Sequence, residues 1–338
     1  MVDPKNQEKS GFSDVQRAAR LSIAPMMDWT DRHCRYFHRL MSQHALLYTE
    51  MVTSPALVRG GALHLLGYND EEHPVAVQLG GSDPKELAAA TKLCVERGFD
   101  EVNLNVGCPS DRVQSGTFGA VLMRDAQLVA DCMFAMKDAS QDVEVTVKCR
   151  IGVDDQVAED VLPDFLTKVS AAGVTRFTIH ARKAWLQGLS PKENRDIPPL
   201  DYPLVHRMKE AFPQLHLSIN GGIASLDQAK EQLKYMDGVM IGRAAYHNPG
   251  DVLLTADQDI YGADTEAKTA HQVIEEMYPY IERQLAQGVR LNAITRHILG
   301  LFTGRPGARM WRRSLSENAH HPGAGIDVVA DALSHVPE

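Results

Sequence analysis

Short runs of apolar and β-branched residues recur along the first 243 residues, and segments with a helical pattern separate them. Each run is five to seven residues long, which is typical of a buried strand. The runs predict eight strands, at residues 21–26, 46–51, 75–79, 101–107, 144–150, 176–182, 215–221 and 238–243. Strands that alternate with helices favour a parallel sheet, so eight such units predict an α/β protein with a closed (β/α)8 TIM barrel.

One intervening segment carries clear helix boundaries. Ser82, Asp83 and Pro84 precede the helical pattern KELAAATKLCVERG, which ends on Gly98. Small polar residues and proline are typical of a helix N-terminus, and glycine is typical of the position after the last turn. The segment therefore predicts a helix between the third and fourth strands.

The pattern becomes purely helical after residues 248–250, which read Asn-Pro-Gly. Two helical segments follow, EAKTAHQVIEEMYPYIERQLAQG and LNAITRHILGLFTG, and no further strand is indicated. We therefore expect a small C-terminal helical domain after the barrel. The predicted organisation is a flexible tail at 1–20, a catalytic barrel at 21–250 and a helical domain at 251–338.

The chain has 338 residues, of which 44% are hydrophobic and 23% are charged, a composition typical of a globular protein. No apolar run approaches the ~20 residues that a membrane span needs. The first 20 residues are polar and lack the apolar core of a signal peptide, so we expect a cytoplasmic protein without a membrane partner. Five widely spaced cysteines with no C-x-x-C pair argue against a disulfide framework or a metal site.

The net charge of -9 and the pI near 5.9 argue against a protein that coats nucleic acid without specificity. One segment departs from this balance. From Arg283 to Ser316 the chain contains seven arginines and no Asp or Glu, which predicts a local basic surface.

Polar residues gather at the carboxyl ends of the predicted strands, and in this fold those ends meet on one face. They are Glu50, Gln78, Asn105, Cys108, Lys148, His180, Asn220 and Arg243, and the apolar Met27 lies at the end of the first strand. The seventh and eighth strands end in Asn220-Gly221-Gly222 and Gly242-Arg243, and such loops either bind phosphate through backbone N–H groups or are simple tight turns. Neither G-x-G-x-x-G nor a P-loop motif occurs, so no Rossmann or P-loop nucleotide site is indicated.

Cys108 lies in the loop after the fourth strand, between Gly107 and Pro109. We expect its thiol to project over the barrel mouth, where it could donate a proton or act as a nucleophile. The other four cysteines are expected to pack in the core. Lys148 could form a Schiff base, bind phosphate, stabilise negative charge or form a structural salt bridge. His180 could equally be a histidine satisfied by neighbouring groups.

Together these residues resemble a known family. The motifs APMMDWTD, VQLGG, NLNVGCPS, KCRIG, IHAR, INGGI and GVMIGRAA, in this order, are similar to those of the tRNA-dihydrouridine synthases. Residues 180–200, HARKAWLQGLSPKENRDIPPL, resemble the A-type subfamily, which reduces uridines 20 and 20a in the tRNA D-loop. The match runs from about Leu21 to Gly325.

The resemblance implies FMN at the barrel mouth and NADPH as the reductant. The implied cofactor-binding residues are Pro25, Met26, Met27, Gln78, Lys148, His180, Asn220, Gly221, Gly222, Gly242 and Arg243. Hydride would pass from N5 of FMN to C6 of uracil, and Cys108 would give a proton to C5. The resemblance implies that Asn105 contacts the edge of the uracil base. It also implies contacts to the rest of the tRNA from Lys192, Arg195, Arg309 and Arg312. No protein partner is implied.

Three other functions share some of these features. A different FMN-dependent barrel could reduce a small pyrimidine or an enone and would not need the arginine-rich domain. An aldolase that uses Lys148 as a Schiff base would need no flavin. A tRNA chaperone with the barrel as a scaffold would not need Cys108.

Overall fold

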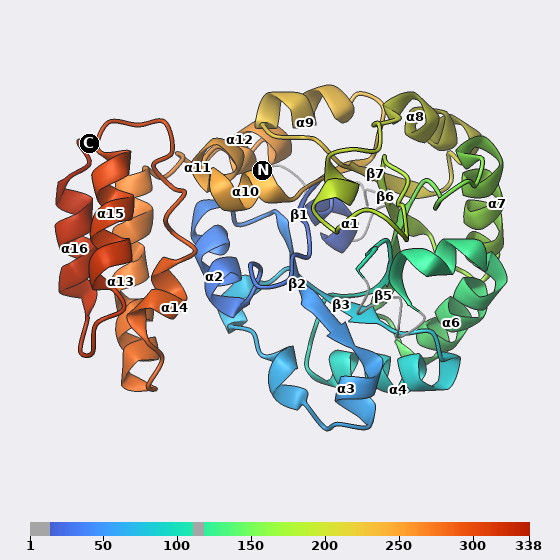
Figure 1. Ribbon diagram of the computed structural model, residues 1–338, viewed down its shortest axis with the longest axis horizontal. Coiled ribbons are helices and arrows are strands. Elements are labelled where there is room, and N and C mark those ends of the chain that lie inside the picture. Colours follow the sequence, from blue (N-terminus) through green and yellow to red (C-terminus); the bar gives the residue numbers. More distant parts are fainter. Residues whose placement is uncertain (1–13, 111–117) are drawn as a thin grey trace, which may run out of the picture.

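In the computed structural model, which describes residues 14–110 and 118–338, eight parallel strands close into a barrel in chain order (Figure 1). They are β1 (Leu21–Ile23), β2 (Leu46–Thr53), β3 (Val75–Gly80), β4 (Glu101–Val106), β5 (Glu144–Arg150), β6 (Arg176–His180), β7 (His216–Asn220) and β8 (Gly238–Ile241). β1 also pairs with β8, with Ile23 opposite Ile241, which closes the ring. The TIM barrel and all eight strands predicted from the sequence are confirmed.

Helices cover the outside of the ring (Figure 1). They are α2 (Arg32–Met41), α3 (Ser54–Val58), α4 (Pro84–Glu96), α6 (Ala126–Ala139), α7 (Ala158–Ala171), α8 (Tyr202–Ala211), α9 (Leu226–Gln232), α10 (Arg243–His247), α11 (Pro249–Leu253) and α12 (Ala256–Tyr261). By contrast, α1 (Asp14–Ala18) lies across the N-terminal end of the barrel, where Gln16 donates a hydrogen bond to Glu144 at 3.2 Å. Among the described residues, short 3₁₀ helices also lie in the connections, namely η1 (Leu63–Leu66), η2 (Asp70–Glu72), η3 (Gly119–Arg124) and η4 (Glu193–Arg195).

The helix predicted between the third and fourth strands is α4, and its boundaries have the expected causes. The side chain of Asp83 accepts a hydrogen bond from the backbone N–H of Glu86 at 2.8 Å, and Pro84 occupies the first turn. Gly98 follows the helix with φ +86°, a left-handed conformation that costs glycine little. This prediction is confirmed.

The interior of the barrel is unusually polar at its N-terminal end. Arg176 and Glu101 are both buried and form an ion pair, and Tyr48 donates a hydrogen bond to Glu101 at 2.6 Å. Glu144 lies 3.3 Å from the Arg176 guanidinium. Burying charge is costly unless opposite charges are paired, and Glu101 provides that pairing for Arg176. The Nε of Arg176 and the Oε2 of Glu144 make no hydrogen bond to any described residue.

The C-terminal helices form a separate layer at one side of the barrel, next to α2 (Figure 1). They are α13 (Ala270–Ala286), α14 (Leu291–Thr295), α15 (Ala308–Asn318) and α16 (Ile326–Ser334). Tyr280 of α13 stacks on Tyr36 of α2, with ring centroids 3.9 Å apart. Trp311 of α15 is fully buried, and its indole N–H donates to the carbonyl of Ile298 at 3.2 Å.

The second C-terminal helix is shorter than its sequence pattern suggested. The pattern extended to Gly304, but α14 ends at Thr295 and turns follow. Gly300 packs so closely on the barrel that an added Cβ would lie 2.5 Å from the carbonyl oxygen of His247. Tertiary contact therefore overrides helical periodicity here. Among the described residues no helix has the length and apolarity needed to cross a membrane.

Candidate active site at the barrel mouth

The carboxyl ends of the strands bring the predicted polar residues to one face of the barrel. Strand register places Asn105 opposite Lys148, and His180 opposite Asn220. The Lys148 ammonium donates a hydrogen bond to the Asn220 side-chain oxygen at 2.9 Å. The Asn220 amide N–H donates in turn to the carbonyl of Met240 at 2.8 Å. These contacts link strands β5, β7 and β8 at the mouth.

Lys148 has no carboxylate partner among the described residues, so the salt bridge that the sequence left open is not formed there. Burial lowers the pKa of Lys148 to about 8, and the positive charge of Arg150 adds to this effect. With this lowered pKa, the Lys148 ammonium loses its proton more readily than an ordinary lysine does. An anionic ligand beside Lys148 would raise its pKa again, so the site is suited to a ligand with negative charge.

His180 presents a buried nitrogen toward this region. Its Nδ1 is buried and has no hydrogen-bond partner among the described residues, so the histidine is not satisfied by its neighbours. Burial lowers the pKa of His180 well below its usual value, and the charges of Arg150 and Lys148 lower it further. The imidazole is therefore neutral at pH 7, and its buried nitrogen is available to a ligand.

The loop after β4 holds Cys108 at the mouth. Asn105 accepts hydrogen bonds on its side-chain oxygen from the backbone N–H groups of Gly107 at 3.0 Å and Cys108 at 2.9 Å. The Cys108 thiol lies 3.6 Å from the Ser110 hydroxyl. Cys108 is half-buried, whereas the other four cysteines are buried, as expected. The loop therefore presents one accessible thiol, and residues 111–117 after it lie outside the described part of the chain.

Arg150 is a component of the site that the sequence reasoning missed. Its guanidinium is buried and donates to the carbonyls of Gly107 at 2.9 Å, Lys183 at 3.0 Å and Asn194 at 2.9 Å. It thus joins the Cys108 loop to the segment 181–200. Arg150 lies two residues after Lys148 on β5, and strand alternation places both on the same face, a signal that could have identified it.

Cys108 is surrounded by positive charge. Burial lowers the pKa of Lys148, Arg150 and Arg195, and a negative charge on the Cys108 sulfur would partly offset this for each of them. The sulfur therefore lies within electrostatic range of all three cations.

The ends of β7 and β8 carry the two glycine loops for which the sequence left phosphate binding and simple tight turns as alternatives. Gly221 and Gly222 have φ values of +112° and +75°, and an added Cβ at Gly222 would lie 2.7 Å from Leu200. An added Cβ at Gly242 would meet no atom closer than 3.6 Å. Arg243 forms hydrogen bonds of 2.6 and 3.2 Å with the carboxylate of Asp196, so a phosphate bound here would compete with that pair.

The turn after β1 contains three further predicted positions, Pro25, Met26 and Met27. The Met26 carbonyl accepts hydrogen bonds from the backbone N–H groups of Trp29 and Thr30 at 3.1 and 3.0 Å. The Met27 side chain is 55% exposed. The turn is thus closed by its own backbone, and Met27 stands at the rim.

The predicted RNA-contacting cations are all exposed. Lys192 and Arg195 lie on the segment 181–200, and Arg309 and Arg312 lie on α15. The arginine-rich stretch has no acid of its own, but it finds partners elsewhere in the structure. Three of its arginines pair with carboxylates, as Arg283–Glu71, Arg296–Asp31 and Arg313–Glu317. Arg290, Arg305, Arg309 and Arg312 have no carboxylate partner among the described residues.

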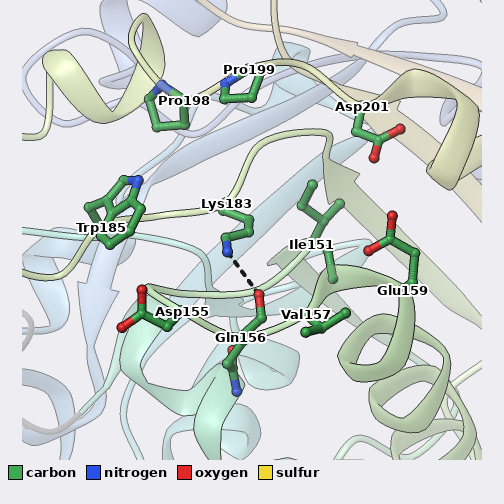
Figure 2. A pocket seen from close by; sticks show the side chains of 11 residues that line it. Ile151, Asp155, Gln156, Val157, Glu159, Lys183, Trp185, Pro198, Pro199 and Asp201 are labelled. Atoms are coloured by element: carbon green, nitrogen blue, oxygen red, sulfur yellow. Dashed lines mark hydrogen bonds between the residues drawn. The ribbon is translucent and has the colours of Figure 1, made fainter.

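A hollow of about 460 Å³ lies on another face of the segment 181–200 (Figure 2). Trp185 and the prolines at 198 and 199 line it, and the Lys183 ammonium crosses it to donate to the carbonyl of Gln156 at 2.8 Å. None of the residues predicted to bind cofactor or RNA lines this hollow. The mouth, and not this hollow, therefore contains the candidate chemistry.

Comparison with known proteins agrees with this geometry. A family model described as dihydrouridine synthase (Dus) matches residues 22–336. The tRNA-dihydrouridine(20/20a) synthase of Vibrio vulnificus (strain CMCP6) is 60% identical over 325 residues, which cover 96% of this chain and 99% of that protein. The Escherichia coli (strain K12) protein of the same name is 60% identical over 328 residues, covering 96% and 94%.

The barrel also resembles a solved structure, the old yellow enzyme homologue from Zymomonas mobilis. The two match with a TM-score of 0.52 and 11% sequence identity, over 75% of this chain and 92% of that chain. At this identity the likeness supports the fold alone.

Proposed function

Because this chain belongs to the dihydrouridine synthase family, we propose that it reduces uridine to 5,6-dihydrouridine in tRNA, with FMN as cofactor and NADPH as reductant. The proposed targets are uridines 20 and 20a of the D-loop, by similarity to the relatives that carry these positions in their names. One observation carries the proposal: the single accessible thiol, Cys108, is held at the mouth beside Lys148.

The residues at the mouth fit FMN. The unpartnered Nδ1 of His180 offers a buried polar atom to a ligand, and Lys148 offers a positive charge. The space beside Gly242 is open for a phosphate to approach the backbone, with Arg243 next to it. Gly221 and Gly222 have the positive φ values that this turn requires, and Leu200 packs against both of them. Gln78 and the turn at 25–27 complete the proposed cofactor site.

When bound, FMN supplies the hydride that adds to C6 of the uracil ring. The thiol of Cys108 donates a proton to C5 and is left as a thiolate near Lys148 and Arg150. Both lone pairs of the Asn105 side-chain oxygen are already used by the loop, so Asn105 can contact uracil only through its N–H. A base within folded tRNA must leave its stack to reach this site.

A basic surface is needed to hold the tRNA backbone, because the protein as a whole is acidic. We expect the Arg309→Ala, Arg312→Ala double variant to bind tRNA on the order of tenfold more weakly. The slope of log affinity against log salt should fall by about one for each lost phosphate contact. Filter binding at several salt concentrations measures both quantities.

The matched control for this variant is Arg97→Ala, which removes an exposed cation at the end of α4. It should leave tRNA affinity unchanged. Equal affinity for the double variant and the wild type would exclude Arg309 and Arg312 from the RNA surface and direct attention to Arg290 and Arg305. The visible flavin spectrum should be the same in all of these proteins.

The experiment that tests the proposed function is a two-step reaction without oxygen. NADPH is added first to bleach the flavin absorbance, and tRNA lacking dihydrouridine is added second. Return of the absorbance together with a gain of two hydrogens in the D-loop supports the proposal. A flavin that NADPH bleaches but tRNA leaves unchanged would favour reduction of a small pyrimidine or an enone.

A tRNA substrate also implies that the protein acts in the cytoplasm.

A further inference from the structure

A continuous line of hydrogen bonds runs through the barrel interior from the Cys108 loop to the ion pair at the opposite end. Five bonds make up this polar column, and each residue donates to the next in the order Cys108 backbone N–H, Asn105, Gln78, Asn103, Thr146 and Glu101. The three amide-to-side-chain bonds are 2.7, 2.8 and 2.8 Å long. The column crosses β4, β3 and β5 and uses side chains that are almost fully buried.

Chemistry at both ends fixes the direction of the polar column. At one end the Glu101 carboxylate can only accept, so the Thr146 hydroxyl must donate to it and must accept from Asn103. At the other end the backbone N–H groups of Gly107 and Cys108 can only donate, so Asn105 must turn its oxygen toward them. The two ends require the same direction, and both intervening amides satisfy it.

The arrangement leaves Asn105 with one uncommitted group. Its oxygen accepts from two backbone N–H groups, and one of its two N–H hydrogens is donated to Gln78 at 2.7 Å. The remaining N–H can pair only with an acceptor. Uracil carries two carbonyl acceptors, so a carbonyl, and not the N3–H group, is the partner for Asn105.

We propose that the polar column is a positioning device for the Cys108 loop and for the base-binding edge of Asn105. Thr146 and Asn103 lie below the mouth and act through Gln78 and Asn105. They hold the Asn105 amide in the one orientation that secures Cys108 and offers an N–H to a carbonyl of the substrate. The second part of this inference rests on the proposed uridine reduction, whereas the first part concerns the loop alone.

The test uses Thr146→Val in the flavin-loaded protein, because valine keeps the shape of threonine and removes both hydrogen bonds. The rate at which iodoacetamide alkylates Cys108 reports the state of the loop, since the other four cysteines are buried. We expect Thr146→Val to raise this rate about fivefold by loosening the hold of Asn105 on the loop. Uridine reduction should fall by a similar factor, and Thr146→Ser, which retains the hydroxyl, should restore both.

Two further variants show whether Thr146 acts through Asn105. In an Asn105→Ala background, Thr146→Val should cause no additional change in alkylation, because the column is already broken above it. Thr178→Val on β6 is the matched control. Thr178 is also buried, and its hydroxyl makes no hydrogen bond to any residue that the structure describes, so this variant should behave like the wild type.

Each outcome is decisive. An unchanged alkylation rate in Thr146→Val, or an equal increase in the presence and absence of Asn105, would overturn the proposal. A comparable increase in Thr178→Val would show general loosening of the barrel and would overturn it as well. A wild-type protein that fails to reduce uridine would remove the proposed function and the base-binding role, while the alkylation rates would still decide the role at the loop.

Discussion

Replacing Cys108 with alanine is expected to slow reduction of uridine in tRNA by about 10² to 10⁴-fold and to leave flavin reduction by NADPH unchanged. The reason is that the thiol is the group placed to donate a proton to C5, and no other cysteine is accessible. Single-turnover mixing of the NADPH-treated enzyme with tRNA measures the affected step directly. Steady-state NADPH oxidation in the presence of tRNA should fall in parallel.

Cys94→Ala is the control for this experiment, because Cys94 is buried in α4 and has no role at the mouth. It should reduce tRNA at the wild-type rate. A Cys108→Ala enzyme that turned over normally would assign the proton to another donor. The Cys108→Ala variant should still bind both flavin and tRNA. Its lower rate can then be assigned to the chemical step and not to a loss of binding.

Replacing Arg176 with methionine is expected to lower the free energy of unfolding by about 3–5 kcal/mol. Burial disfavours the charged guanidinium, but Glu101, Tyr48 and Glu144 outweigh that effect and raise the pKa of Arg176. Methionine would leave the Glu101 carboxylate buried without its counter-charge. Urea denaturation followed by circular dichroism measures the loss.

Arg313→Met provides the matched comparison on the surface. Arg313 pairs with Glu317 at 2.9 Å, but both side chains are more than half exposed, so water already solvates their charges. Removing this pair should change the free energy of unfolding by no more than about 1 kcal/mol. Similar losses in the two variants would mean that the ion pair inside the barrel contributes no more than one on the surface.

The sequence was sufficient to predict the barrel because the eight strands repeat one local pattern, and a local pattern needs no knowledge of contacts. The residues at the mouth followed from the fold, since parallel strands of a barrel end on the same face. Lys148 and Asn220 are hydrogen-bonded there, although 72 residues separate them along the chain. For the individual FMN and tRNA contacts, the family resemblance provided predictions that still await experiment.

Other features depend on pairings that a single sequence does not contain. The partners of Arg283 and Arg296 are Glu71 and Asp31, each more than 200 residues away, so these two arginines looked unpaired in the sequence when they were not. The polar column required the strand register that sets Gln78 opposite Asn103 and Asn103 opposite Thr146. The turns after α14 bring Gly300 close to His247, and helical periodicity gives no sign of this contact.

Seven arginines are concentrated in one acid-free segment, and this distribution of charge affects how tRNA approaches the protein. Residues 283–316 contribute +7 to a net charge of -9, so the remainder of the protein carries -16. A polyanion is therefore attracted toward the surface that carries these arginines and repelled by acidic surfaces before any contact forms. Its approach is oriented during diffusion, and association should be fastest at low ionic strength, where this long-range field is least screened.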